Sequence, residues 1–478
     1  MAPLAVALLL LIGACSRGPD GRQIVMPDLP ELPKSQPSRA AAVDREHARI
    51  LATYGGEYND PQLHALITRS VARLVAASDR PEQPYRVTLL NSPAVNAFAL
   101  PSGQLYVTRG LTALANDTSE LVSVLAHEMA HVTARHAAIR EDKTRQAALV
   151  ANVVNQVLSD PQMGALALAK SNIALASFSR AQEFEADGIG VGIAARAGFD
   201  PYGAERFLTS MGRSAGLRVP AGQDNAQPLE FLSSHPSTPD RVRSVVTQAR
   251  RYSGPGAGAR DKAAYLATLD GLVYGEDPSE GYVRGRNFLH PRLGFTFTAP
   301  EGFALDNTAQ AVLGIKDDGG QALRLDVVRV PGEQSLAAYL TSGWLENIDG
   351  SSISELSING FPAATALAKG DHWAFRLFAL RFGSDVYRFI FAARPMTPEA
   401  DRLFRQSIQS FRRLSLAEIQ AAKPLRISIR TARPGDTVER LAREMAVADR
   451  AVERFRVLNG LAPREQPKPG DLMKLVVE

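Results

Sequence analysis

Residues 122–136, VSVLAHEMAHVTARH, place two histidines four positions apart, with a glutamate directly after the first. A helix is expected to begin just before this stretch, because Asp117 can cap its first turn and Glu120, three residues later, can complete a capping box. Side chains four residues apart stand about 6 Å apart on one helix face. His127 and His131 can therefore bind the same ion.

Glu128 projects beside these histidines, which is the HExxH arrangement of the zincins. The alternative is a polar helix on which one histidine caps a carbonyl and Glu128 is a solvated charge. A catalytic zinc site needs three protein ligands and a water, so a third ligand would decide between these interpretations. Residues 178–198, FSRAQEFEADGIGVGIAARAG, predict a second helix that ends at Gly198 and carries Glu183 and Asp187 one turn apart.

Glu183 can complete a site of two histidines and one glutamate, while Asp187 can accept the free ring N–H of a zinc-bound histidine and fix its tautomer. Glu185 should point elsewhere, as an exposed acidic residue favoured by the helix dipole. His136 is offset from the face of the metal pair, so it is expected behind the ligands or at the surface rather than on the metal.

Four segments, in this order along the chain, carry a resemblance to a known family: VNAFALPSGQLYVTRG, HEMAHVTARH, SRAQEFEAD and SSHPSTPDR. Together they resemble the gluzincin proteases that include the HtpX and BepA types and the CAAX prenyl endopeptidases, over roughly residues 43–250. The resemblance implies one zinc ion per chain, Glu183 as its third ligand, and Asp187 behind His127.

A zinc site of this kind lowers the pKa of water from about 15.7 toward roughly 7 and polarises the peptide carbonyl. Glu128 is then expected to act as the general base, taking the proton of the water and passing it to the leaving amine. No covalent intermediate is required.

Residues 87–110, VTLLNSPAVNAFALPSGQLYVTRG, predict a β-hairpin around Pro101-Ser102-Gly103. A strand at a sheet edge can pair with an extended peptide by strand addition. The resemblance assigns substrate binding to three residues of this edge: Asn96, Ala97 and Phe98. For Asn96 the alternative is a turn-capping role.

The irregular segment 233–241, SSHPSTPDR, contains two prolines and must be positioned by tertiary contacts. The resemblance places His235 and Arg241 at the metal cleft, where they are expected to serve catalysis. His235 has two incompatible roles open to it, either stabilising the oxyanion or covering the zinc as an inhibitory ligand.

Residues 1–14 contain an apolar core, Leu4–Ile12, that is too short to span a bilayer and predicts an export signal. The segment Ile12–Cys15 resembles a bacterial lipobox, and Cys15 is the only cysteine, so it is expected to be lipidated. The alternative is an ordinary cleaved signal with an incidental cysteine. Residues 15–42 would act as a tether for an outer-membrane lipoprotein on the periplasmic side.

A length of 478 residues, 45% of them hydrophobic and 22% charged, predicts about three domains in a globular protein. The net charge of +4 is too small to argue for a nucleic-acid partner. We expect an α+β protein: a mainly helical zincin domain with a small active-site sheet at 43–252, a linker at 253–282 and an α+β domain at 283–415. The third segment shows strands of period two and a closing helix, and its His290 and His372 are expected to be structural.

Residues 421–478 predict the order strand, helix, helix, strand, with two Pro-Gly-Asp turns and a Leu-Asn-Gly-Leu segment. They resemble a LysM module, the βααβ fold associated with peptidoglycan. The alternative is a packing module that no longer binds glycan.

Two functions remain for the whole chain. The preferred one is a zinc endopeptidase of the bacterial envelope that cleaves misfolded or mistargeted envelope proteins, held at the membrane by its lipid anchor and near the wall by the LysM-like module. The rival is a chaperone or assembly adaptor with a dormant protease site. The complete set of metal and base residues favours the enzyme.

Overall fold

The computed structural model describes residues 39–139, 178–217, 235, 238–316, 319–343, 347–370, 372–447 and 449–478. The predicted signal peptide, Cys15 and nearly all of the tether lie outside these residues. Helices and several sheets are both present, which confirms a mixed α and β architecture. The chain divides into units 1–45 and 46–478, and the contacts below lie within the second. No helix of the described residues has the length and apolar character needed to cross a membrane.

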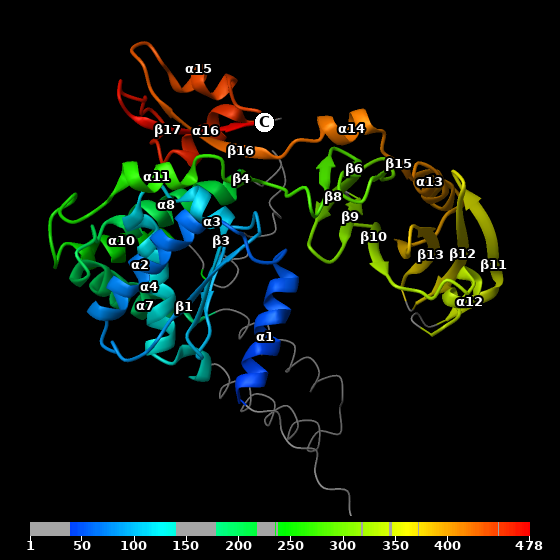
Figure 1. Ribbon diagram of the computed structural model, residues 1–478, viewed down its shortest axis with the longest axis horizontal. Coiled ribbons are helices and arrows are strands. Elements are labelled where there is room, and N and C mark those ends of the chain that lie inside the picture. The colour runs from blue at the N-terminus through cyan, green and yellow to red at the C-terminus, as the bar shows by residue number, and fades with distance from the viewer. Residues whose placement is uncertain are drawn as a thin grey trace, which may run out of the picture. The chain divides into compact units, whose positions relative to one another are not determined.

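The described residues from 39 to 269 are mainly helical and contain one small sheet (Figure 1). In that sheet β3 lies in the middle, parallel to β1 and antiparallel to β2, so the hairpin predicted around Pro101 is present and β2 forms an edge. The strands are β1 Arg86–Leu90, β2 Ala97–Ala99 and β3 Gln104–Thr108. The helices are α1 Arg39–Thr53, α2 Pro61–Ala77, α3 Arg109–Leu114, α4 Thr118–Thr133, α7 Arg180–Arg196, α8 Gly203–Gly216, α10 Pro239–Ala249 and α11 Lys262–Leu269.

Helix α4 is buried along almost its whole length, from Thr118 to His131, and is packed against α2, α7, α8 and β2. Asp117 caps it as predicted, because its Oδ1 accepts a hydrogen bond from Glu120 N at 2.9 Å. The predicted capping box is wrong in its second half: Glu120 Oε2 accepts from Asn116 N at 2.9 Å instead. The acid therefore fastens the loop before the helix rather than the cap itself.

Two glycines allow neighbouring helices to approach α4 closely. A Cβ atom at Gly190 of α7 would lie 2.9 Å from His127 N, and one at Gly203 of α8 would lie 2.2 Å from Ser119 O. Neither contact leaves room for a side chain. Backbone contact at Gly190 is what brings the acidic start of α7 next to the histidines of α4.

The region from Tyr282 to Arg413 is built on antiparallel strands, in a seven-stranded sheet of order β11-β12-β13-β14-β10-β9-β8 and a four-stranded sheet of order β15-β7-β6-β5. The two strands predicted around Gly383 form the hairpin β13–β14, in which Phe382 pairs with Asp385. The strands are β5 Tyr282–Arg284, β6 Asn287–His290, β7 Phe295–Thr298, β8 Phe303–Asn307, β9 Val312–Lys316, β10 Gln321–Val328, β11 Ile348–Ile358, β12 Phe361–Lys369, β13 Ala374–Phe382, β14 Asp385–Ala393 and β15 Arg412–Arg413. The helices are α12 Leu336–Leu340 and α13 Pro398–Gln409.

After α14, Leu416–Ala421, the last segment has the order β16 Leu425–Thr431, α15 Val438–Arg443, α16 Ala451–Leu458 and β17 Leu472–Val477. This is the order of elements expected from the sequence. Strand β16 pairs with β17 and also with β4, Val273–Tyr274, which lies in the segment expected to be a linker. Helix α11 of that same segment buries Tyr265, Leu266 and Leu269.

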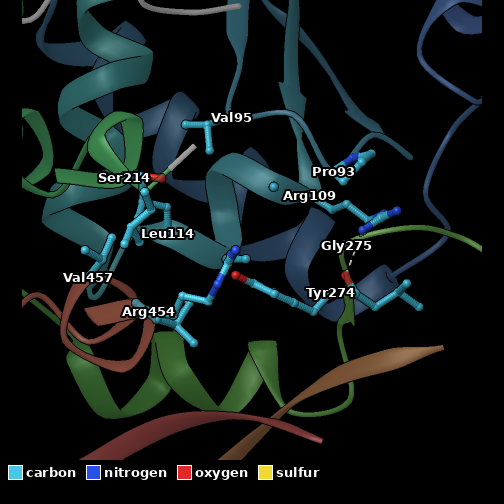
Figure 2. A pocket seen from close by; sticks show the side chains of 14 residues that line it. Pro93, Val95, Arg109, Leu114, Ser214, Tyr274, Gly275, Arg454 and Val457 are labelled. Carbon is cyan, nitrogen blue, oxygen red and sulfur yellow. Dashed lines mark hydrogen bonds between the residues drawn. The ribbon is translucent and has the colours of Figure 1, made fainter. Parts of the chain in front are cut away.

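The C-terminal segment shares one continuous hydrophobic cluster with the helical region of residues 39–269, in which Leu441 and Phe455 belong with Leu269. A pocket of about 210 Å³ lies at this seam, lined from α3, α8, β4 and α16, and Figure 2 shows Arg109, Tyr274 and Arg454 around it. The C-terminal segment is thus packed onto this helical region and is not merely joined to it by the chain.

Candidate metal centre

Two histidines of α4 form the base of the candidate site. His127 and His131 lie one turn apart, and their Nε2 atoms are only 3.0 Å from each other. Both side chains are buried among α4, α7 and the segment at His235. As predicted from their spacing, the two rings share one face of the helix and point their Nε2 atoms at the same place.

The start of α7 brings two carboxylates to these rings. Ser179 and Gln182 form a capping box that begins the helix, and Glu183 lies in its first turn. Glu183 Oε2 is 3.6 Å from His127 Nε2, and Glu183 Oε1 is 3.5 Å from His131 Nε2. Asp187, one turn later, has its Oδ1 3.0 Å from His127 Nδ1. Both acids therefore occupy the positions expected of them.

The irregular segment before α10 adds a third histidine and an arginine. His235 Nδ1 lies 2.9 Å from Glu183 Oε1 and 3.3 Å from His127 Nε2. Arg241 is buried and contacts both carboxylates of α7: its Nη1 forms an ion pair with Glu183 Oε2 at 2.7 Å, and its Nε and Nη2 donate to the two oxygens of Asp187 at 2.8 and 2.7 Å. Arg241 therefore stands on the α7 side of the site, where it holds the acids together.

The geometry of the donor atoms fits zinc. His127, His131, Glu183 and His235 are all buried, and one nitrogen or oxygen from each lies within 4.8 Å of all the others. Zinc bonds of about 2.0–2.2 Å in a tetrahedron place ligand atoms about 3.3–3.6 Å apart. Five of the separations between these donor atoms run from 2.9 to 3.6 Å. Nitrogen and carboxylate donors are those that zinc takes in proteins, so this cluster can hold one zinc ion.

Burial and charge set the protonation of the site. Burial raises the pKa of Glu128, and burial together with the neighbouring histidines keeps the pKa of His131 well below its usual range. For Asp187, the hydrogen bonds from Arg241 and His127 outweigh burial and lower the pKa. In His127, hydrogen bonds to Asp187 and Glu183 outweigh burial and raise the pKa to about 9. A metal ion must therefore displace a proton from His127, so binding should weaken as the pH falls.

A cleft of about 460 Å³ opens next to the cluster and has Glu128, His131 and His235 in its wall. The wall also includes Phe98 and Leu100 from the end of β2. Glu128 Oε1 is buried and has no hydrogen-bond partner among the described residues. His235 Nε2 lies 3.7 Å from this oxygen, which is an ion-pair distance and not a hydrogen bond. A carboxylate oxygen without a hydrogen bond beside a cleft is available to a reacting molecule.

The three residues expected to bind substrate do not share one environment. Phe98 lines the cleft, whereas Asn96 and Ala97 are buried. Asn96 Nδ2 donates to the hydroxyl of Tyr54 at 3.0 Å, and Asn96 N donates to Thr108 Oγ1 at 3.1 Å. In this structure Asn96 therefore helps to hold the β2 edge in place.

Two further residues contact His131, and the sequence pointed to only one of them, His136, as a residue behind the ligands or at the surface. Phe178 lies against the ring of His131, with centroids 4.0 Å apart, and no motif pointed to this residue. His136 is buried behind His131 rather than at the surface, and Glu185, which is 58% exposed as expected for an outward-facing acid, nevertheless reaches His136. The HExxH spacing alone could not place a histidine five positions beyond the second ligand.

Comparison with known proteins supports this assignment of the site. Residues 61–249 match the model of peptidase family M48. The beta-barrel assembly-enhancing protease of Escherichia coli (strain K12) is 32% identical over 202 residues, 40% of this chain and 40% of that protein. The protein of that name in Yersinia pestis is 31% identical over 289 residues, 56% of this chain and 57% of the relative. The mitochondrial metalloendopeptidase OMA1 of Schizosaccharomyces pombe is 31% identical over 204 residues, 42% of this chain and 57% of that protein. The matches thus span between two-fifths and somewhat over half of each relative's length.

Proposed function

Because residues 61–249 belong to peptidase family M48, we propose that this chain is a zinc-dependent endopeptidase of the bacterial envelope that cleaves misfolded or mistargeted envelope proteins. One observation carries the enzymatic part: His127, His131 and Glu183 bring their donor atoms together at zinc-like separations, directly beside Glu128, whose Oε1 accepts no hydrogen bond from the described residues. Three protein ligands and an adjacent base are what hydrolysis at a zinc site needs.

The proposed chemistry assigns the proton transfers to Glu128. When bound, zinc supplies Lewis acidity, which lowers the pKa of water and polarises the scissile carbonyl. Glu128 takes the proton of the attacking water and delivers it to the leaving amide nitrogen. Burial raises the pKa of this carboxyl, which makes it a better base than an exposed glutamate and suits both halves of that transfer.

The supporting residues keep the ligands in place. Asp187 accepts from His127 Nδ1, which leaves the lone pair of Nε2 free for the metal. Arg241 bridges Asp187 and Glu183, and its two hydrogen bonds to Asp187 and its ion pair with Glu183 keep it turned toward the acids. We therefore propose Arg241 as a positioning residue, and not as the transition-state contact that the family resemblance suggested.

The β2 edge is proposed to bind the substrate backbone. An extended peptide paired with Ala97–Ala99 would lie along the cleft that contains Glu128, and Phe98 would contact its side chains. Asn96, which holds this edge through Tyr54 and Thr108, is proposed to fix the register of the paired peptide.

His235 is proposed to be a gate. Its Nδ1 takes a place in the donor cluster beside His127 and Glu183, and a tetrahedral site with three other protein ligands has only one position left for water. Basal activity should then be low until His235 leaves. Under this proposal His235→Ala raises basal casein cleavage and leaves one zinc per chain. A fall of about 100-fold would instead assign His235 to the oxyanion.

The test of the enzymatic proposal is the metal content and casein cleavage of purified protein. We expect about one zinc per chain, and Glu128→Gln should keep the zinc but lose about 10²–10⁴ of the hydrolytic rate. Glu301→Gln, at an exposed carboxylate of the strand-rich region, is the matched control and should change neither quantity. Full activity in Glu128→Gln would remove the proposed mechanism.

The envelope location and partners form a further part of the proposal. It is supported by the signal and lipobox pattern ending at Cys15, by the similarity to the bacterial beta-barrel assembly-enhancing proteases and by the βααβ order of residues 425–477. Binding of the full chain to isolated peptidoglycan, competed by soluble N-acetylglucosamine oligomers, tests the LysM-like assignment. The rival function, an envelope chaperone or adaptor with a dormant site, predicts client binding without zinc-dependent cleavage.

A further inference from the structure

A second histidine lies directly behind the metal-facing His131. His136 is buried, and its Nδ1 is 2.9 Å from His131 Nδ1, on the side of the ring that faces away from the donor cluster. The other ring nitrogen of His136, Nε2, lies 3.3 Å from Glu185 Oε2. The three side chains form a line that begins at the cluster and ends at an exposed carboxylate.

The backbone is bent to make this contact possible. In an uninterrupted α-helix, a residue five positions on is rotated by about 140°, so His136 would face away from His131. Helix α4 instead ends at Thr133, and Arg135 has a left-handed φ of 56°. Non-glycine residues adopt this conformation rarely and at some cost. Here it turns the chain so that His136 faces the ring of His131.

Proton counting fixes the direction of the hydrogen bonds. His131 points Nε2 into the donor cluster, 3.0 Å from His127 Nε2, so a metal bound there uses that lone pair. A neutral imidazole carries one N–H, which must then be on Nδ1 of His131. Nδ1 of His136 has to accept that hydrogen. The proton of His136 is therefore on its Nε2, where it faces Glu185.

We propose that His136 and Glu185 form a relay that orients His131 for metal binding: Nδ1–H of His131 donates to His136, and Nε2–H of His136 donates to Glu185. The relay rests on the proposed zinc site and adds two positioning residues to it. His127 has a direct carboxylate partner in Asp187, whereas His131 reaches its carboxylate through a second imidazole. Phe178 packs against the ring of His131. The Nδ1 edge of that ring, which faces away from the donor cluster, contacts His136.

Three substitutions separate this role from simple packing. His136→Leu introduces an apolar side chain of similar size and removes the hydrogen-bond acceptor. It should weaken zinc binding by about 10- to 100-fold, the usual effect of losing a hydrogen-bond partner of a metal ligand. His136→Asn places an amide oxygen near the position of Nδ1 and should therefore bind zinc almost as tightly as the wild type. Glu185→Gln should lower the zinc affinity by less than tenfold, because this carboxylate is 58% exposed and its charge is screened.

Zinc affinity is measured on the full chain by competition with a chelator, and the visible spectrum of the cobalt-substituted protein reports the ligand geometry. Unfolding of the metal-free variants is measured alongside, and Ile139→Ala, at an exposed position three residues away, is the control that should leave zinc affinity unchanged. We expect the largest shift of affinity and spectrum in His136→Leu, a smaller loss of affinity in Glu185→Gln, and His136→Asn close to wild type.

Wild-type affinity in His136→Leu would overturn the relay, as would a loss in His136→Asn as large as that in His136→Leu. If His136→Leu does not fold, the zinc affinities of His136→Asn and Glu185→Gln are compared with that of the wild type. A larger loss of zinc affinity in Glu185→Gln than in His136→Asn supports the relay. Wild-type zinc affinity in Glu185→Gln overturns it. A wild-type protein that binds no zinc would instead refute the proposed function itself.

Discussion

Replacing Asp187 by alanine should damage the protein in two separable ways. Asp187 accepts from His127 Nδ1 at 3.0 Å and also receives two hydrogen bonds from Arg241, at 2.7 and 2.8 Å. The first contact serves the metal, and its loss should weaken zinc binding by about 10- to 100-fold. The two hydrogen bonds from Arg241 place the charge of Asp187 beside a buried guanidinium. Removing one partner of a buried ion pair costs about 3–5 kcal/mol of folding stability.

The predicted loss of stability through Arg241 can be checked by a double-mutant cycle. The cycle is measured on metal-free protein, so that bound zinc does not add to the stability. Asp187→Ala removes two hydrogen bonds of the buried Arg241 and keeps its ion pair with Glu183. Adding Arg241→Met removes the stranded charge and should return about 2–4 kcal/mol of the lost stability. Zinc affinity should not recover, because the carboxylate beside His127 Nδ1 is still missing and a methionine sulfur is only a weak acceptor.

The assays are urea unfolding of the four metal-free proteins and chelator competition for zinc. Asp187→Asn is the matched control, since its amide oxygen can still accept from His127 while its charge is lost. If the double variant is no more stable than Asp187→Ala, Arg241 is not the source of the instability. If zinc affinity recovers together with stability, the proposed support of His127 is refuted.

Four further results are expected. Burial lowers the pKa of His290 to about 4, so between pH ~4 and ~6.5 the folded state binds fewer protons than the unfolded state. The free energy of unfolding should therefore fall by at most about 3 kcal/mol as the pH falls through this window. In urea unfolding, His290→Gln should show a weaker dependence of stability on pH. Leu100→Trp should narrow the cleft and lower kcat/KM on casein by roughly tenfold at unchanged zinc content, and wild-type kinetics would exclude the cleft as the binding site. Deleting 421–478 should uncover the cluster around Leu269 and give an insoluble or inactive protein, whereas a soluble, active fragment would show that the segment folds apart. Cys15→Ser should abolish lipid labelling and release the protein from the membrane fraction, and continued membrane association would contradict the anchor.

Local signals in the sequence were sufficient to predict much of the candidate site. The cap at Asp117, the helical period of α4 and the i, i+4 spacing of His127 and His131 are properties of a few consecutive residues, and the structure retains all three. Pairing these histidines with Glu183 needed the family resemblance, because the two helices are about fifty residues apart in the chain. Periodicity says which face is apolar but not which other helix covers it.

What the sequence could not predict depends on tertiary contacts and on one unusual backbone conformation. The helical pattern around HEMAHVTARH gives no sign that Arg135 is left-handed, so His136 could only be placed behind the ligands or at the surface. The partner of Glu120 is the backbone of Asn116 and not the cap, which depends on the path of the preceding loop. Arg241 was expected at the metal cleft, but nothing local fixed it on the carboxylates of α7.

The position of Lys474 shows why the C-terminal segment is not an appended binding module that could be removed freely. Its side chain is fully buried, and Nζ donates to the carbonyl oxygens of Ala113, Leu114 and Ala115 at 2.7, 3.3 and 2.8 Å. The last carbonyls of a helix have no partner within it, and a cation there is favoured by the helix dipole. A residue of β17 thus completes the end of α3, three residues before α4 begins at Thr118. Any glycan-binding role of this segment must coexist with that structural one.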